Sequence, residues 1–155
     1  MAGAYDDRDG VIWMDGELVD WRDAKVHILT HGLHYGSSVF EGERAYNGKI
    51  FKSMEHSKRL LKSGEYMDIP IPYTVDEIEA AKAEVLAASG LQDAYVRALC
   101  WRASGEDMGV ASARNPVKMA IAVWEWGAYY GDAKMKGAKL DIAKWKRPSP
   151  ETIPC

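Results

Sequence analysis

The chain has 155 residues, 47% of them apolar, which is enough to bury the core of one ordinary domain and excludes a disordered polypeptide. Its 20 basic and 23 acidic residues are interspersed and nearly balanced, so no nucleic-acid partner is expected. Two unpatterned cysteines, the acidic start over residues 1–10 and the lack of a long apolar run predict a cytoplasmic protein without a secretory signal or a membrane span.

Two β-hairpins are expected in the first third of the chain. An Asp-Gly pair at residues 15–16 and an Asn-Gly pair at residues 47–48 are typical of two-residue turns between antiparallel strands. The strands expected on either side of these turns are 11–14 and 17–20, then 39–46 and 49–51.

Helices are expected next. Residues 54–66 carry a helical apolar spacing with Ser53 available as N-cap, and Thr74 with Glu77 forms a capping box for a second helix that stops at Gly90. Further strands are expected at 94–102 and 117–124. Locally paired strands, then helices, then strands predict an α+β fold with an antiparallel sheet.

The domain boundaries follow from composition. We expect a small α+β domain over 1–130, an interdomain linker over 131–138, and the start of a second, cofactor-binding domain over 139–155. The alternation in 139–145 predicts the first strand of that domain. Because no closing element follows it, we expect the chain to be truncated.

Three clustered histidines, His27, His31 and His34, have a spacing that could surround a metal. No cysteine-rich or carboxylate-rich partner set and no metalloprotease helix accompanies them, which favours histidines that orient a turn through hydrogen bonds. We expect no metal site.

Tyr95 and Arg97 lie two apart in an expected strand, so their side chains share one face. A hydroxyl beside a guanidinium can grip a carboxylate. The alternative is an arginine on an edge strand that is merely solvated.

The second hairpin places Phe40, Gly42, Arg44 and Tyr46 on one face. A gap beside a cation could admit a ligand, but a core-facing strand with a glycine where another backbone packs closely is the alternative. Arg59, on a helix, could bind a phosphate bidentately or be an ordinary solvated side chain.

Several segments, taken together, resemble the signature segments of branched-chain amino acid aminotransferases, the fold-type IV group of pyridoxal-phosphate enzymes. They occur in the family's order and near its spacing, and they cover nearly the whole chain. These segments are 31–46, 56–60, 95–97, 108–110, 126–129 and 150–154.

The resemblance implies a role for each candidate residue. Arg59 would hold the phosphate of pyridoxal 5'-phosphate, Tyr95 would contact the substrate α-carboxylate, and Arg97 with Tyr35 would receive the distal carboxylate of glutamate. Tyr35 and the loop 108–110 would reach a neighbouring subunit, which implies a homodimer or an assembly of dimers. The remaining pocket residues implied are Phe40, Gly42, Arg44, Met108, Val110, Trp126 and Tyr129.

The implied reaction is amino transfer between leucine, isoleucine or valine and 2-oxoglutarate. In the family the catalytic lysine lies beyond the segment at 150–154, so no catalytic residue is expected here, and Lys144 and Lys146 do not replace it. We therefore expect the fragment alone to be inactive. D-amino acid aminotransferase, aminodeoxychorismate lyase and a non-catalytic binding domain are the alternatives.

Overall fold

A computed structural model describes residues 4–111, 113–127, 131 and 133–152 of the chain. Its contacts divide the chain into two units, Met1–Glu125 and Trp126–Cys155, and each is described by itself. In the described residues no helix combines the length and the apolar character that a membrane span requires.

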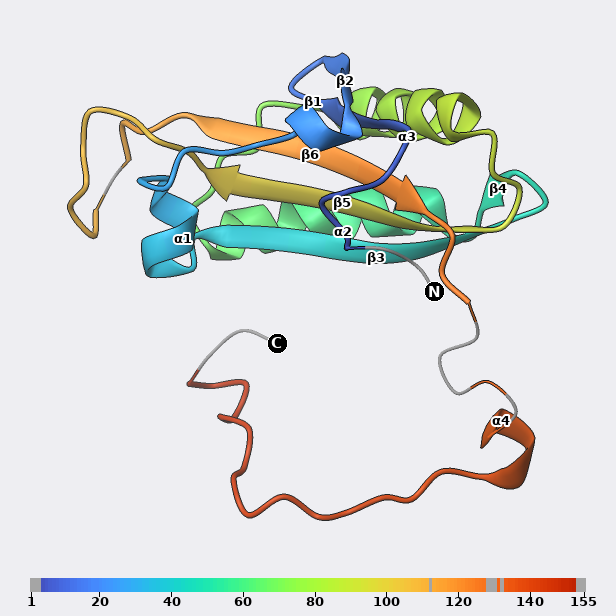
Figure 1. Ribbon diagram of the computed structural model, residues 1–155. Helices are drawn as coiled ribbons and strands as arrows, with labels where there is room; N and C mark the ends of the chain where they lie inside the picture. The colour runs from blue at the N-terminus through green and yellow to red at the C-terminus, as the bar shows by residue number, and fades with distance from the viewer. Residues whose placement is uncertain (1–3, 112, 128–130, 132, 153–155) are drawn as a thin grey trace. The chain divides into compact units, whose positions relative to one another are not determined.

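The described residues of the first unit form one six-stranded antiparallel sheet in the order β2-β1-β6-β5-β3-β4 (Figure 1). The strands expected in this unit are confirmed to within one residue, together with both hairpin turns and the α+β class. The strands are β1 Val11–Met14, β2 Glu17–Asp20, β3 Ser38–Tyr46, β4 Lys49–Ile50, β5 Ala94–Arg102 and β6 Val117–Trp124.

Strand β5 lies in the middle of the sheet, because it pairs with β3 on one side and β6 on the other. Gly42 is opposite Arg97, and Tyr95 is opposite both Arg44 and Trp124. The alternative that Arg97 is an edge-strand residue is therefore wrong. Residues of paired strands lie directly on both sides of it.

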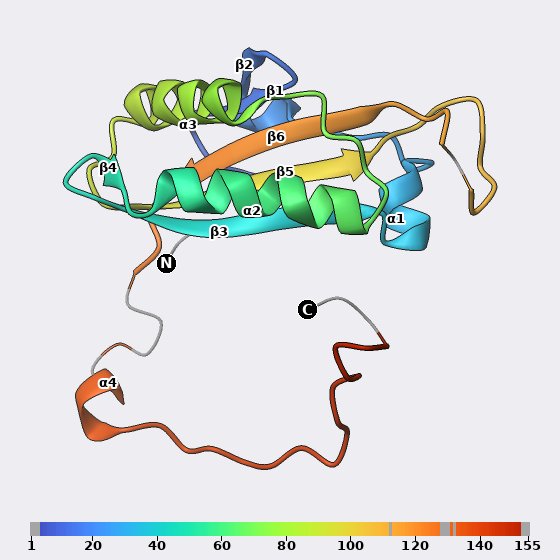
Figure 2. The same ribbon diagram turned by 180° about the vertical axis from the view of Figure 1, so that it is seen from behind.

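Helices α2 (Ser53–Tyr66) and α3 (Val75–Ser89) cover one face of this sheet (Figures 1 and 2). Alternate residues of the strands point to that face and form the apolar core, which accounts for their burial. Leu60, Val85, Val96, Met119 and Ile121 are among its fully buried side chains.

Both expected helices are confirmed, with one correction at a terminus. Thr74 and Glu77 form the predicted capping box, and Gly90 ends α3 in the left-handed conformation. Ser53, however, is the first residue of α2, and Lys52 is its N-cap. The Ser53 hydroxyl instead donates to Glu79 of α3 at 2.9 Å, a tertiary contact that outweighs the local capping preference.

The opposite face of the sheet carries no helix comparable to α2 or α3 in the described part of the chain. A 3-10 turn, Trp21–Asp23, follows β2, and the short helix α1 (His31–Tyr35) lies beside the ends of β3 and β5 (Figure 1). We call this second face the open face. Five of the ten residues to which the resemblance assigns a substrate role lie on it: Phe40, Gly42, Arg44, Tyr95 and Arg97.

In the second unit, the described residues contain the short helix α4, Ala133–Lys136. The prediction of a strand over 139–145 is wrong, because those residues form no strand. A strand requires a neighbour to satisfy its N–H and C=O groups, and none pairs with this segment among the described residues. Its apolar side chains Leu140, Ile142 and Trp145 are each more than 90% exposed.

Candidate functional site

An arginine surrounded by aromatic rings occupies the open face. The guanidinium of Arg97 lies 4.4 Å from the ring centroid of Phe40, 5.3 Å from that of Tyr95 and 5.8 Å from that of Trp124. Each contact has cation–π distance, and the rings of Tyr95 and Trp124 pack at 4.8 Å. We call Phe40, Tyr95, Arg97 and Trp124 the Arg97 cluster.

The Arg97 cluster can bind an anion. One terminal nitrogen of Arg97 donates to the Tyr95 hydroxyl at 2.9 Å, as the shared face of the two residues predicts. The Nε atom of Arg97 is buried and, among the described residues, has no hydrogen-bond partner. A guanidinium held among rings with donor capacity left over is suited to a carboxylate.

Gly42 lies under this cluster, and the interpretation that it leaves a gap for a ligand is wrong. A Cβ atom added at Gly42 would lie 2.1 Å from the Tyr95 hydroxyl and 3.0 Å from its Cζ. The space is already filled, by a side chain rather than by the backbone of the alternative reading. Glycine at this position makes room for the Tyr95 hydroxyl where it accepts the hydrogen bond from Arg97.

We expect Gly42→Ala to displace Tyr95 and to lower the free energy of unfolding by about 1–3 kcal/mol, the usual cost of overpacking. Chemical unfolding followed by tryptophan fluorescence measures it. In a Tyr95→Phe background, which removes the clashing oxygen, the cost of the alanine should be smaller. Equal costs in both backgrounds would show that the clash is not with the Tyr95 hydroxyl.

A hollow of about 350 Å³ extends along the open face from the Arg97 cluster. Arg97 is the charged residue that lines it, and most of the other lining side chains are apolar, including Ile12, Leu33, Leu99 and Trp101. An apolar hollow with one cation suits a ligand that has a hydrocarbon body and an acidic group.

Tyr35 belongs to a second cluster, at the end of the sheet where α1 meets the loop before β6. Its hydroxyl donates to the carbonyl of Met108 at 2.9 Å, and His31 bonds the carbonyl of Gly109 at 3.0 Å. Val110 is 76% exposed beside them. The structure therefore brings Tyr35, Met108 and Val110 together, and no hydrogen bond among the described residues joins Tyr35 to Arg97.

Histidines in this region orient local structure, as the hydrogen-bond interpretation predicts. The Nδ1 atom of His27 accepts from the backbone of Leu29, and His34 bonds the carbonyl of Ile28. His31 is buried and also bonds the Ser37 hydroxyl at 2.6 Å. In the described residues no group of three or more histidine, cysteine or acidic side chains could hold a metal.

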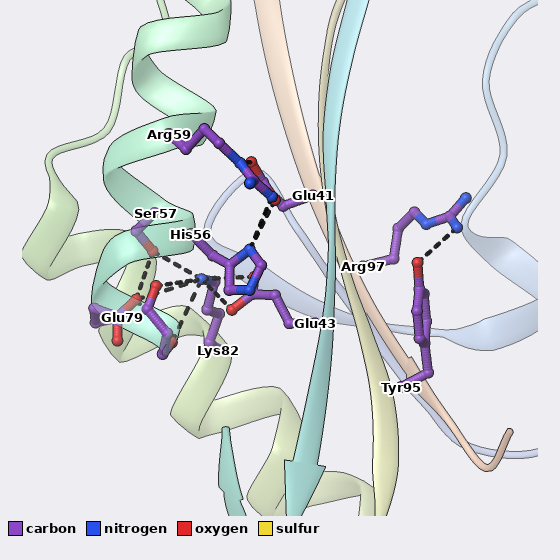
Figure 3. Close-up of polar contacts among 10 residues, drawn as sticks. Glu41, Glu43, His56, Ser57, Arg59, Glu79, Lys82, Tyr95 and Arg97 are labelled. Carbon is purple, nitrogen blue, oxygen red and sulfur yellow. Dashed lines mark hydrogen bonds and ion pairs between the residues drawn. The ribbon is translucent and has the colours of Figure 1, made fainter. Parts of the chain in front are cut away.

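Arg59 lies on the other side of the sheet, between α2 and β3 (Figure 3). Its Nε donates to Oε1 of Glu41 at 2.6 Å, and one terminal nitrogen donates to Oε2 at 2.5 Å. His56 also bonds Oε2, at 2.8 Å. Burial raises the pKa of the Glu41 carboxyl, but the bonds from Arg59 and His56 outweigh it and lower that pKa below its ordinary value.

The structure does not bring Arg59 together with Tyr95 and Arg97. Glu41 and Gly42 are adjacent in β3, so they face opposite sides of the sheet, and Arg59 follows Glu41 (Figure 3). The outer edge of β3 pairs with β4 only at Ala45 and Tyr46. The rest of that edge has no strand partner among the described residues. A ligand that touched both Arg59 and the open face would pass around it.

The remaining candidates are Arg44, Trp126 and Tyr129. Arg44 lies 5.7 Å above the Tyr46 ring on the open side of β3. Trp126 opens the second unit, and Tyr129 lies outside the described residues.

Three residues of these clusters were missed from the sequence: Trp124, Glu41 and His56. Trp124 could have been found from strand pairing, because it is the direct partner of Tyr95. Glu41 could have been found from alternation, because a carboxylate at a core-facing strand position needs a buried partner.

The fold and these clusters define an α+β domain that carries an arginine among aromatic rings on its open face and a second arginine, Arg59, near the free edge of β3. The profile of the amino-transferase class IV family matches residues 38–153, so the chain belongs to that family. A branched-chain-amino-acid aminotransferase from Pseudomonas aeruginosa is 45% identical over 146 residues, which are 91% of this chain and 47% of that protein.

Solved structures of branched-chain aminotransferases are similar to this chain in fold as well. A branched-chain aminotransferase from the archaeon Thermoproteus uzoniensis, solved with norvaline, superimposes with a TM-score of 0.85 at 31% identity, over 95% of this chain and 50% of that one. Another branched-chain amino acid aminotransferase, from T.th. and complexed with N-(5'-phosphopyridoxyl)-L-glutamate, has a TM-score of 0.85 at 38% identity, with 95% and 49% coverage. The chain spans about half the length of the relatives it matches.

Proposed function

We propose that this chain supplies the substrate-facing small domain of a pyridoxal-phosphate-dependent branched-chain amino acid aminotransferase. The whole enzyme would move an amino group between leucine, isoleucine or valine and 2-oxoglutarate. The observation that supports this best is the Arg97 cluster beside an apolar hollow, because one site must accept both a branched side chain and a dicarboxylate. The similarity to aminotransferases of that name supports it independently.

The residues present fit the phosphate of the cofactor at Arg59. Its side chain is 66% exposed, and its Nη1 has no hydrogen-bond partner among the described residues, so one side of the planar fork can bind an anion. When bound, pyridoxal phosphate supplies a conjugated ring that accepts electrons as the amino group moves. This chain would contribute the anchor for its phosphate.

The open face would handle the substrate. The Tyr95 hydroxyl would donate to the α-carboxylate, and Arg97 would take the distal carboxylate of glutamate. Phe40 and Arg44 would shape the rest of the pocket, and Gly42 would make room for Tyr95. The rings around Arg97 are apolar, and apolar surroundings would strengthen its attraction for a carboxylate. An apolar side chain would lie against the same rings.

We further propose a cytoplasmic homodimer, with a small domain over 1–130, a linker over 131–138 and a cofactor domain that starts at 139. Apolar side chains around α1 support the dimer: Ile28, Leu33 and Val110 are 71%, 61% and 76% exposed. Exposed apolar side chains of this kind are typical of an interface when they lie together. Tyr35, Met108 and Val110 would cross it to the partner's site.

The test uses a hybrid enzyme, residues 1–152 of this chain followed by the part of the Pseudomonas aeruginosa relative that lies beyond the match. We expect it to sediment as a dimer or larger and to convert leucine and 2-oxoglutarate with the cofactor added. Turnover of D-alanine, or lysis of aminodeoxychorismate, in place of leucine would favour one of the related enzymes. A folded hybrid that binds the cofactor but acts on none of these would contradict the proposal.

A further inference from the structure

Arg59 is held from behind by a buried carboxylate. The Glu41 side chain is 5% exposed, whereas that of Arg59 is 66% exposed. Two parallel bonds, at 2.6 and 2.5 Å, join the two groups through both oxygens of Glu41. Because a bidentate pair fixes the plane as well as the position of a guanidinium, Arg59 has one orientation although most of it is in solvent.

His56 fixes the carboxylate in turn. Its Nδ1 lies 2.8 Å from Oε2 of Glu41 and 3.3 Å from a terminal nitrogen of Arg59. An ionised carboxylate can only accept, so the shorter contact is a donation from Nδ1–H to Glu41. The longer contact, between His56 and Arg59, then joins two donors and is not a hydrogen bond. His56 and Arg59 therefore approach Glu41 from adjacent turns of α2, and Glu41 is anchored in β3 (Figure 3).

The two bonds determine which part of Arg59 is available. Nε and Nη2 are taken by Glu41, and Nη1 is left among the described residues. Without Glu41, a long arginine side chain at an exposed helix position would sample many rotamers, and ordering it would oppose binding.

We propose that Glu41, oriented by His56, is a positioning residue that sets Arg59 in advance for a phosphate monoester. The inference rests on the proposed role of Arg59 as the phosphate anchor. A carboxylate also repels a phosphate, so the two effects compete. Glu41 lies on the far side of the guanidinium and its charge is already compensated by Arg59, whereas the orientation it imposes lowers the entropy cost of binding. Orientation should therefore outweigh repulsion.

The decisive variant is Glu41→Gln in the hybrid enzyme. It keeps the shape of the side chain but removes its negative charge and one of its two acceptor oxygens. We expect the dissociation constant for pyridoxal 5'-phosphate to rise about tenfold. Binding of pyridoxal, which lacks the phosphate, should change little. Glu55→Gln is the matched control, since Glu55 pairs with Lys52 on the same helix and should leave both constants unchanged.

A purely structural role for Glu41 would weaken pyridoxal and pyridoxal 5'-phosphate alike, and a dominant repulsion would make the phosphate ester bind more tightly. Either result overturns the inference. Arg59→Met distinguishes failure of the positioning role from failure of the proposed function. If it leaves the affinity for the phosphate ester unchanged, the proposed role of Arg59 as the phosphate anchor is wrong. If it weakens affinity and Glu41→Gln does not, only the positioning role is wrong. In the Arg59→Met background, Glu41→Gln should have no further effect.

A second readout needs no cofactor. In the 155-residue chain, the Arg59 Nε–H proton should exchange slowly with water and give its own resonance by nuclear magnetic resonance. Glu41→Gln should speed that exchange, and Glu55→Gln should not. Unchanged exchange in Glu41→Gln would show that Glu41 does not restrain Arg59.

Discussion

Lys82→Met is expected to lower the free energy of unfolding by about 3–5 kcal/mol, the usual cost of leaving a buried charge without its partner. Lys82 of α3 is 1% exposed. Its ammonium lies 2.7 Å from Oε1 of Glu43, as an ion pair, and donates a hydrogen bond to Oε2 at 2.8 Å (Figure 3). A further bond, at 2.8 Å, reaches the hydroxyl of Ser57 in α2, so one group joins β3, α2 and α3.

The physical reason is that Glu43 cannot reach water once Lys82 is removed. Burial raises the pKa of the Glu43 carboxyl, and the Lys82 ammonium opposes that rise. The double variant Glu43→Leu with Lys82→Met removes both charges and should recover most of the loss, because apolar side chains of similar size can replace a buried pair.

Urea unfolding of the 155-residue chain measures both variants. Lys62→Met is the control, because Lys62 pairs with Glu65 at the surface and should leave the midpoint unchanged. A loss in Lys82→Met no larger than in the control would show that Glu43 is neutral or hydrated in the folded chain.

Arg97→Met in the hybrid enzyme is expected to lower kcat/KM for glutamate by about 10- to 100-fold, the range for loss of a hydrogen bond to a charged group. Leucine has no distal carboxylate, so its kcat/KM should fall by less than about threefold. Methionine keeps apolar contact with Phe40 and Trp124, which limits the loss of packing.

Steady-state assays with the two amino acids measure this separation. Lys118→Met is the matched control: it removes a cation from another strand of the same unit, where Lys118 bonds Asp15 at 2.9 Å. Equal losses for glutamate and leucine in Arg97→Met would place the distal carboxylate elsewhere.

Local patterns predicted the strands and helices well, because each depended on neighbouring residues. The Asp15-Gly16 and Asn47-Gly48 turns and the Thr74 capping box use contacts within a few positions, so the sequence contains the whole signal. Segment 139–145 has the alternation of a strand, but a strand also depends on a partner, which alternation does not supply.

The candidate site was predicted only in part, because its geometry depends on strand register. The shared face of Tyr95 and Arg97 follows from their spacing, whereas the approach of Phe40 and Trp124 requires both pairings of β5. Arg59 and Lys82 both look like solvated helix residues in sequence. Only the packing of α2 and α3 on β3 shows that Glu41 and Glu43 are their partners.

The proposed roles of this chain in cofactor anchoring and substrate recognition are tested by borohydride reduction of the hybrid with pyridoxal 5'-phosphate, followed by mass spectrometry of the modified peptide. We expect one reduced adduct, on a lysine of the Pseudomonas aeruginosa portion. Arg59→Met should lower the yield of this adduct. In this chain Lys82 is buried in its ion pair, and Lys144 and Lys146 are exposed in the second unit. A stoichiometric adduct on any lysine within residues 1–152 would contradict the assignment of this chain to anchoring and substrate recognition.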